Sequence, residues 1–125
     1  MGFLTGKKAL IVGVASNRSI AWGIAESMAA NGCEVAFTYQ TEKLKGRVEK
    51  CAEICNSSIV IPCDVSSDEQ IKETFVELKK SWDSVDILIH SAAFAERSEL
   101  DGNYLEVTTR EGFLNAHEIS SYSFT

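Results

Sequence analysis

Short apolar segments alternate with amphipathic helical patterns along the whole sequence, and this alternation restricts the fold more than any other feature. The apolar segments cover residues 8–14, 34–39, 58–61 and 86–90. Helical spacing of apolar residues is expected between them, over residues 19–31, 42–55 and 67–83. Right-handed crossovers between such strands give a parallel sheet. The sequence therefore predicts an α/β fold, a Rossmann-type doubly wound parallel sheet with strand order 3-2-1-4.

Capping patterns mark the expected starts of two helices. Ser67 with Gln70, and Thr108 with Glu111, each place a hydroxyl residue three positions before a Glu or Gln, as in a capping box. Residues 91–103 are expected to form a loop, and the helix that Thr108 opens is expected to continue to the end of the sequence. No repeat or linker interrupts this order, which favours one domain.

Charge and hydropathy exclude two classes of partner. The 125 residues include 18 acidic and 12 basic side chains, a net charge of −6, whereas nucleic-acid binding requires a clustered basic face. No segment approaches the ~20 apolar residues that a membrane helix needs, and no signal-peptide pattern precedes the first apolar segment. We therefore expect a cytoplasmic protein that binds neither nucleic acid nor membrane.

The turn after the first expected strand has features of a phosphate-binding turn. Gly13 lets the backbone approach a ligand, and Ser19 is expected to cap the following helix and to offer its hydroxyl to a phosphate. The G-x-G-x-x-G pattern is absent, because the next glycine after Gly13 is Gly23. This turn alone is therefore compatible with a dinucleotide site or with an ordinary turn of another doubly wound protein.

Polar residues follow the next two expected strands. Gln40 stands where dinucleotide enzymes place the residue that meets the adenosine ribose, and its neutrality favours NADH over NADPH although Lys43 lies nearby. A strand-end surface glutamine is the alternative. Asp64 and Val65 follow the third strand, where the carboxylate could accept a hydrogen bond from the adenine amino group. A plain turn before a helix would explain Asp64 nearly as well.

Small residues and cysteines allow simpler interpretations. After the fourth strand, Ala92 and Ala95 would let a nicotinamide lie close to the backbone, whereas His90 is more typical of a core histidine than of a catalyst.

The cysteines contain no C-x-x-C pair, and only Cys51 and Cys55 share a helix face, with no histidine nearby to complete a metal site. We expect buried structural thiols and no metal.

Several motifs together resemble one family over the whole chain. They are Met1-Gly2-Phe3-Leu4, the spacing Gly13-x5-Ser19-x-Ala21, Ala36-Phe37-Thr38-Tyr39-Gln40, Leu44-Lys45-Gly46-Arg47-Val48, Cys63-Asp64-Val65 and Thr109-Arg110-Glu111-Gly112-Phe113. In this order they resemble the bacterial NADH-dependent enoyl-acyl-carrier-protein reductases, divergent members of the short-chain dehydrogenase/reductase superfamily. The family usually has Ile-Gly or Ile-Ala after Ser91, whereas this chain has Ala92-Ala93.

The resemblance implies a reaction and a set of contacts. It implies hydride transfer from NADH to the β-carbon of a trans-2-enoyl thioester carried by acyl carrier protein, in a homotetramer of fatty-acid synthesis. It also implies that the Ala95 backbone touches the acyl substrate. The residues implied to touch the cofactor are Gly13, Ser19, Ile20, Gln40, Asp64, Val65 and Ala92.

The resemblance also implies that catalytic residues are missing from this chain. The family uses a tyrosine and a lysine after the next strand, and here no lysine follows Lys80. Tyr39 and Lys43 match Tyr-x-x-x-Lys, but they stand at the adenosine end, so we reject them as a catalytic pair. Residues 1–125 are thus expected to be the N-terminal part of a dinucleotide-binding Rossmann domain, truncated before the fifth strand and inactive alone.

Two other functions fit the same sequence. The chain could be an NADH-binding module without turnover. It could also be a short-chain dehydrogenase acting on an alcohol or ketone. That class usually shows three clustered glycines in the first turn and Asn-Asn-Ala-Gly after the fourth strand, where this chain has Ser19 and His90-Ser91-Ala92-Ala93.

Overall fold

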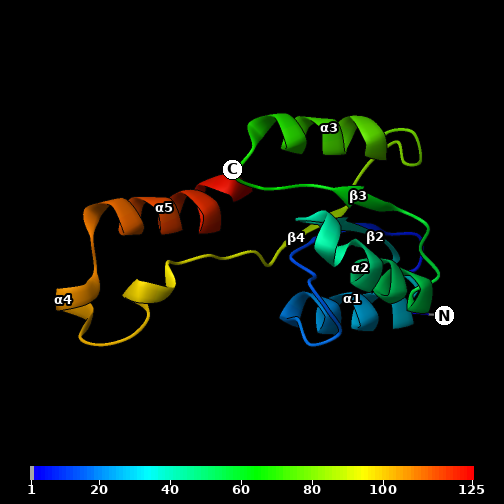
Figure 1. Cartoon of the computed structure of the whole chain (residues 1–125). Helices are drawn as coiled ribbons and strands as arrows, with labels where there is room; N and C mark the ends of the chain where they lie inside the picture. The colour runs from blue at the N-terminus through cyan, green and yellow to red at the C-terminus, as the bar shows by residue number, and fades with distance from the viewer. Residues whose placement is uncertain (1) are drawn as a thin grey trace. The chain divides into compact units, whose positions relative to one another are not determined.

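The computed structural model describes residues 2–125 and contains two compact units. The first, called the sheet unit, is Met1–Ser91, of which residues 2–91 are described; the second, called the C-terminal unit, is Ala92–Thr125 (Figure 1).

The sheet unit is built on a four-stranded parallel sheet with the order β3-β2-β1-β4, which confirms the predicted topology. The strands are β1 (Lys8–Val12), β2 (Glu34–Tyr39), β3 (Val60–Pro62) and β4 (Ile87–His90). Strand β1 ends at Val12, and Gly13 after it takes a φ of 117°, outside the extended region. Strand β3 includes Pro62, which an edge strand tolerates because one side of it needs no backbone donor.

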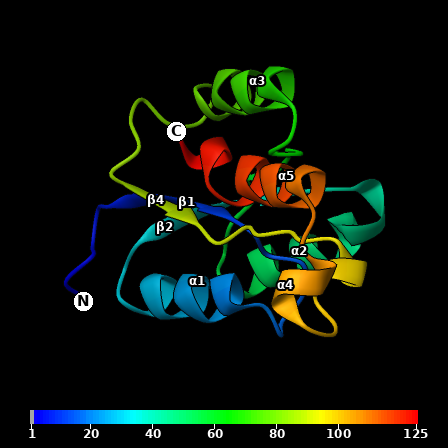
Figure 2. The same cartoon turned by 90° about the vertical axis from the view of Figure 1, so that its left-hand side faces the viewer.

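Helices cover both faces of this sheet, as Figures 1 and 2 show. Helices α1 (Ile20–Ala30) and α2 (Glu42–Ile54) pack on one face against Ile11 and Phe37, which are fully buried. Helix α3 (Asp68–Leu78) covers the other face, where Leu78 and Trp82 contact Leu10 and Ile61. Alternate residues of β1 thus enter different cores, as the period of a strand requires.

The start of α3 confirms half of its predicted capping box. Ser67 Oγ accepts a hydrogen bond from the Gln70 amide at 3.3 Å. The Gln70 side chain does not return to Ser67, because its Oε1 accepts from the Asp64 amide at 2.8 Å. The predicted end near Asp83 is wrong: α3 ends at Leu78, and Ser81 N donates to Leu78 O in the turn that follows.

The C-terminal unit consists of one longer helix with short helices before and after it in the sequence. These are η1 (Arg97–Glu99), α4 (Tyr104–Val107), α5 (Arg110–Ser120) and η2 (Tyr122–Phe124). The predicted Thr108–Glu111 capping box is wrong, because Thr108 Oγ1 donates to Tyr104 O at the end of α4, a helix that the sequence did not predict. Thr109 caps α5 instead, since its Oγ1 accepts from the Gly112 amide at 3.0 Å.

Within residues 2–125, none of the helices has the length and hydropathy needed to cross a lipid bilayer.

Candidate functional site

The candidate residues of the sheet unit gather at one edge of the sheet. Gly13 follows β1, Gln40 follows β2, and Asp64 lies two residues after β3. Because all these strands are parallel, their carboxyl ends lie at the same edge, which is where open α/β sheets bind ligands. The structure therefore brings the candidate phosphate turn and the candidate adenosine residues together.

The turn between β1 and α1 is held by hydrogen bonds from its own serines. Ser19 Oγ accepts from the amides of Ala15 and Ser16 at 3.0 and 3.3 Å. Ser16 Oγ in turn accepts from the Arg18 amide at 3.2 Å. Ser19 is the N-cap residue of α1, but its side chain makes no capping hydrogen bond, so the predicted hydroxyl cap is wrong. The hydroxyl orders the turn instead.

The first turn of α1 presents backbone donors at this edge. The Trp22 and Gly23 amides both donate to Ser19 O, at 3.1 and 3.4 Å. Across the described chain, the amides of Ile20 and Ala21 have no hydrogen-bond partner, as is usual for the first residues of a helix. Ser19 Oγ only accepts in its two bonds, so its own proton is left to donate. Such donors at the positive end of a helix suit an anion.

Residues after β2 and β3 are placed at the surface of the same edge. Gln40 is exposed, and Asp64 and Val65 are partly buried. Asp64 Oδ1 accepts from the amide and the hydroxyl of Ser66 at 2.9 and 2.7 Å, which is the turn that the sequence allowed as the simpler explanation. The structure gives Asp64 Oδ2 no partner among residues 2–125, so that oxygen can still accept a hydrogen bond.

Tyr39 is surrounded by groups that oppose a catalytic role. The ring is 4% exposed, its hydroxyl donates to Glu42 Oε1 at 3.2 Å, and Lys45, not Lys43, places its Nζ 5.9 Å from the ring centre. Burial first, and then the hydrogen bond to Glu42, raises the pKa of Tyr39. A tyrosine hydroxyl that stabilises an enolate oxygen donates better when its pKa is lowered, so the raised pKa agrees with rejecting the Tyr39–Lys43 motif.

The cysteines lie in the core of the sheet unit, as predicted. Cys33, Cys51 and Cys63 are buried and Cys55 is partly buried, all as free thiols. Burial raises the pKa of each thiol, and that of Cys55 to about 11. Within the described residues, no group of three or more His, Cys, Asp or Glu side chains could hold a metal ion.

The C-terminal unit contains the two remaining candidates, Ala92 and Ala95, both partly buried. Between them, the Phe94 amide donates to Ser120 Oγ at 3.0 Å, and Ser120 Oγ donates to Phe94 O at 3.2 Å. The backbone N–H and C=O of Ala95 have no partner in residues 2–125. Sequence reasoning missed Ser120, because nothing in the local pattern indicates a partner that lies 26 positions away.

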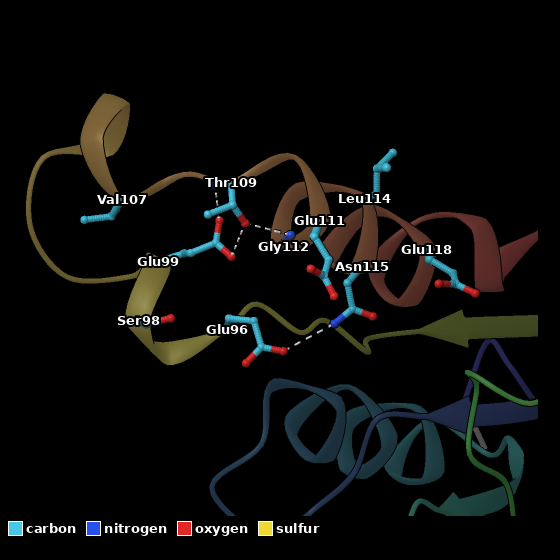
Figure 3. A pocket seen from close by; sticks show the side chains of 10 residues that line it. All are labelled: Glu96, Ser98, Glu99, Val107, Thr109, Glu111, Gly112, Leu114, Asn115 and Glu118. Atoms are coloured by element: carbon cyan, nitrogen blue, oxygen red, sulfur yellow. Dashed lines mark hydrogen bonds between the residues drawn. The ribbon is translucent and has the colours of Figure 1, made fainter.

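A pocket in the C-terminal unit is strongly acidic (Figure 3). Glu96, Glu99, Glu111 and Glu118 line it, together with residues of α5. Figure 3 shows the Glu99 carboxylate beside Thr109, whose amide donates to Glu99 Oε1 at 2.6 Å and whose hydroxyl donates to Oε2 at 3.3 Å. Four carboxylates repel a diphosphate, so the candidate phosphate site stays at the Gly13–Ser19 turn.

Known proteins resemble this chain in sequence and in structure. The profile of the enoyl-(acyl carrier protein) reductase family matches residues 13–125. Enoyl-[acyl-carrier-protein] reductase [NADH] FabI of Haemophilus influenzae is 56% identical over 124 residues, which is 99% of this chain and 47% of that protein. FabI of Escherichia coli is 55% identical with the same shares covered, 99% and 47%. The chain thus spans about half the length of these relatives.

Solved structures show the same likeness. The crystal structure of enoyl-[acyl-carrier-protein] reductase (NADH) from Aquifex aeolicus has a TM-score of 0.94 and 49% identity, covering 98% of this chain and 48% of that one. The Anaplasma phagocytophilum reductase, solved in complex with NAD, has a TM-score of 0.93 and 42% identity, covering 99% of this chain and 47% of that one. With a family profile that matches residues 13–125, the chain belongs to the enoyl-(acyl carrier protein) reductase family.

Proposed function

We propose that residues 1–125 are the N-terminal part of the dinucleotide-binding domain of an NADH-dependent enoyl-acyl-carrier-protein reductase. The observation that carries the proposal is a set of hydrogen-bond donors at the start of α1, in the turn that Gly13 opens. The Ile20 and Ala21 amides and the Ser19 hydroxyl proton have no acceptor among residues 2–125. They lie at the carboxyl edge of a parallel sheet, where a diphosphate binds in dinucleotide folds. The relatives are named for NADH, and the Anaplasma structure holds NAD.

Each candidate residue has a role in this proposal. The diphosphate lies on Gly13, Ser19 and Ile20, whose side chain is 79% exposed at the start of α1 and can cover a ligand. Gln40 meets the adenosine ribose, the free Asp64 Oδ2 accepts from the adenine amino group, and Val65 borders the adenine. Ala92 lies against the nicotinamide, and the Ala95 backbone binds the acyl substrate.

The neutral side chain of Gln40 supports NADH as the cofactor. A 2′-phosphate needs a positive charge beside the ribose, and a neutral amide at this position offers none. Lys43 is exposed on α2. Replacing Gln40 with arginine is expected to improve NADPH binding at the expense of NADH.

The proposed reaction transfers a hydride from the nicotinamide C4 to the β-carbon of a trans-2-enoyl thioester. The π electrons of the carbon–carbon double bond then join the α-carbon to the carbonyl carbon, and the carbonyl π pair moves to the thioester oxygen to give an enolate. Re-formation of the carbonyl and addition of a proton to the α-carbon give the saturated acyl chain, with NAD⁺ as the oxidised cofactor. No lysine follows Lys80 in residues 1–125, so they lack the tyrosine–lysine pair that the resemblance implies for this step. These residues alone are therefore proposed to bind NADH without oxidising it.

The assembly and location of the protein are also proposals. The resemblance to the family supports a homotetramer that works in fatty-acid synthesis in the cytoplasm. Sedimentation of the full-length protein that contains residues 1–125 tests the assembly. A monomer at micromolar concentration would contradict the homotetramer.

The proposal is tested with alanine variants of two glycines that both have positive φ. Gly13 and Gly6 both have positive φ, 117° and 82°, but Gly6 precedes β1 at the opposite end of the strand. Gly13→Ala is expected to weaken NADH binding about tenfold or more, because an L side chain at positive φ distorts the turn at a cost of about 1–3 kcal/mol. Gly6→Ala is expected to lower stability and leave the NADH dissociation constant unchanged.

Fluorescence titration with NADH measures the affinity, and NADH oxidation with crotonyl thioester measures turnover. Equal NADH affinity in both variants would contradict the proposed site. If the longest polypeptide that carries residues 1–125 binds NADH and never oxidises it with an enoyl thioester, the protein is a cofactor-binding module instead.

A further inference from the structure

Residues 92–99, here called the strap, are tied to helix α5 at three points within the C-terminal unit. Phe94 bonds Ser120, Glu96 Oε1 accepts from Asn115 Nδ2 at 3.5 Å, and Glu99 accepts from Thr109. The partners run backward along α5 as the strap runs forward, so the strap lies antiparallel to the helix. Figure 3 shows the two ties nearer the start of α5.

The tie at Ser120 differs from the others because one hydroxyl bonds both backbone groups of one residue. Ser120 Oγ accepts from Phe94 N–H and donates to Phe94 C=O, at 3.0 and 3.2 Å. A hydroxyl donates one hydrogen bond and can accept others, so the bond to Phe94 C=O takes up the single proton of Ser120 Oγ. The orientation of the Phe94 backbone relative to α5 is thereby fixed at two atoms.

Fixing Phe94 C=O also fixes the direction of the next amide. Phe94 C=O and Ala95 N–H belong to one planar peptide, and in a trans peptide these two groups point in opposite directions. The described chain has no cis peptide. Since Phe94 C=O points toward Ser120, Ala95 N–H points away from it, and this N–H has no partner within residues 2–125.

We infer that Ser120 is a positioning residue for the acyl substrate, acting through the Phe94–Ala95 peptide. The inference rests on the proposed function, in which the Ala95 backbone contacts the enoyl thioester. The ligand group that fits an outward N–H is a carbonyl oxygen, as found in a thioester or in the amide groups of an acyl carrier. Ser120 itself touches neither substrate nor cofactor in this scheme.

The chain offers a matched control at the next position. Ser121 is also a serine at the end of α5, but it is exposed and its side chain bonds no strap residue among those described. Ser120→Ala and Ser121→Ala therefore make the same chemical change one residue apart. Ser120→Thr keeps the hydroxyl and is the conservative variant.

Steady-state kinetics on the longest polypeptide that carries residues 1–125 tests the inference. Ser120→Ala is expected to raise KM for a crotonyl thioester about tenfold with KM for NADH unchanged, because a lost substrate contact of about 1.4 kcal/mol is tenfold in affinity. Ser121→Ala is expected to match the wild type, and Ser120→Thr to restore most of the substrate KM. A general loss of structure would instead change both KM values.

Hydrogen exchange of the Phe94 amide gives a second readout that needs no activity. Ser120→Ala is expected to speed this exchange at least tenfold, and Ser121→Ala to leave it unchanged. Ser120→Cys, which keeps the size but weakens both hydrogen bonds, replaces Ser120→Ala if circular dichroism shows that the alanine variant is unfolded. A wild type without enoyl-thioester-dependent NADH oxidation contradicts the proposed function, and the inference falls with it. An active wild type in which Ser120→Ala behaves like Ser121→Ala overturns the inference alone.

Discussion

The sheet unit and the C-terminal unit are stabilised by different interactions. In the sheet unit, apolar side chains from Ala9 to Trp82 are buried on both faces of the sheet. In the C-terminal unit, Gly112 is the sole buried residue among those described, and large apolar residues such as Leu105 and Phe113 are exposed. Hydrogen bonds of the strap and of the helix ends therefore contribute a larger share of the stability of the C-terminal unit than of the sheet unit.

This difference predicts unequal resistance to local unfolding. Burying a large apolar side chain contributes about 1.5–3 kcal/mol to the free energy of unfolding, whereas one hydrogen bond contributes a net of about 0.5–1.5 kcal/mol. A unit that depends on a few partly exposed hydrogen bonds opens at lower free energy than a packed core. We expect amide exchange to be fast in the C-terminal unit and slow in β1 and β2.

The largest expected effect comes from paired phenylalanine truncations. Phe37 is 0% exposed at the centre of the sheet unit, and Phe113 is 54% exposed on α5. Phe37→Ala is expected to lower the free energy of unfolding by about 3–5 kcal/mol, since it leaves a cavity, and Phe113→Ala by less than about 1 kcal/mol. Urea unfolding followed by circular dichroism measures both. Equal losses of unfolding free energy in the two variants would contradict the proposed difference in stabilisation between the units.

Two glycine-to-alanine changes are expected to act in opposite directions. A Cβ at Gly112 would collide with the Glu99 carboxylate, whereas a Cβ at Gly46, inside α2, meets nothing. Gly112→Ala is expected to displace Glu99 from Thr109 and to destabilise the C-terminal unit by up to about 1 kcal/mol, because the two lost hydrogen bonds outweigh the helix preference of alanine. Gly46→Ala is expected to stabilise the sheet unit by about 0.5–1 kcal/mol, because alanine favours helix.

Hydrogen-exchange rates of the Thr109 and Phe113 amides measure the effect of Gly112→Ala, and urea unfolding measures the effect of Gly46→Ala. If Gly112→Ala leaves the Thr109 amide as protected as before, Glu99 does not hold the start of α5.

The last expected effect is a loss of stability at alkaline pH. Burial, with smaller contributions from Cys51 and Glu26, raises the pKa of Cys55 from 9.0 to about 11 in the folded chain. Above pH 9 the unfolded thiol loses its proton while the folded thiol keeps it, so the free energy of unfolding falls between pH 9 and 11. Cys55→Ala is expected to reduce this slope in urea unfolding at several pH values. An unchanged slope would mean that other groups cause it.

The order of the sheet could be predicted because it depends on local pattern and chirality. Apolar runs and helical spacing recur within short windows, and right-handed crossovers then leave few arrangements of parallel strands. The shared edge of Gly13, Gln40 and Asp64 follows directly, since carboxyl ends of parallel strands coincide. Gly13 has a φ of 117°, which favours glycine at the end of β1; its contact with a cofactor stays a prediction.

The use of individual hydroxyl groups could not be predicted in the same way. Ser19 was expected to cap α1 and instead accepts from Ala15 and Ser16. Of two adjacent threonines, Thr108 closes α4 and Thr109 caps α5, although the sequence favoured Thr108 as the cap. Each hydroxyl had several backbone partners within reach, and the sequence pattern does not rank them.

The sequence by itself determined the parallel sheet, its order and the edge that carries Gly13, Gln40 and Asp64, because these depend on periodicity and handedness. Only the tertiary structure decided which polar groups find no partner among residues 2–125, such as the Ile20, Ala21 and Ala95 amides, and that Ser120 bonds the Phe94 backbone. The physical reason is that a hydrogen bond between Phe94 and Ser120 joins positions 26 apart, and the distance between such positions is set by packing rather than by local pattern.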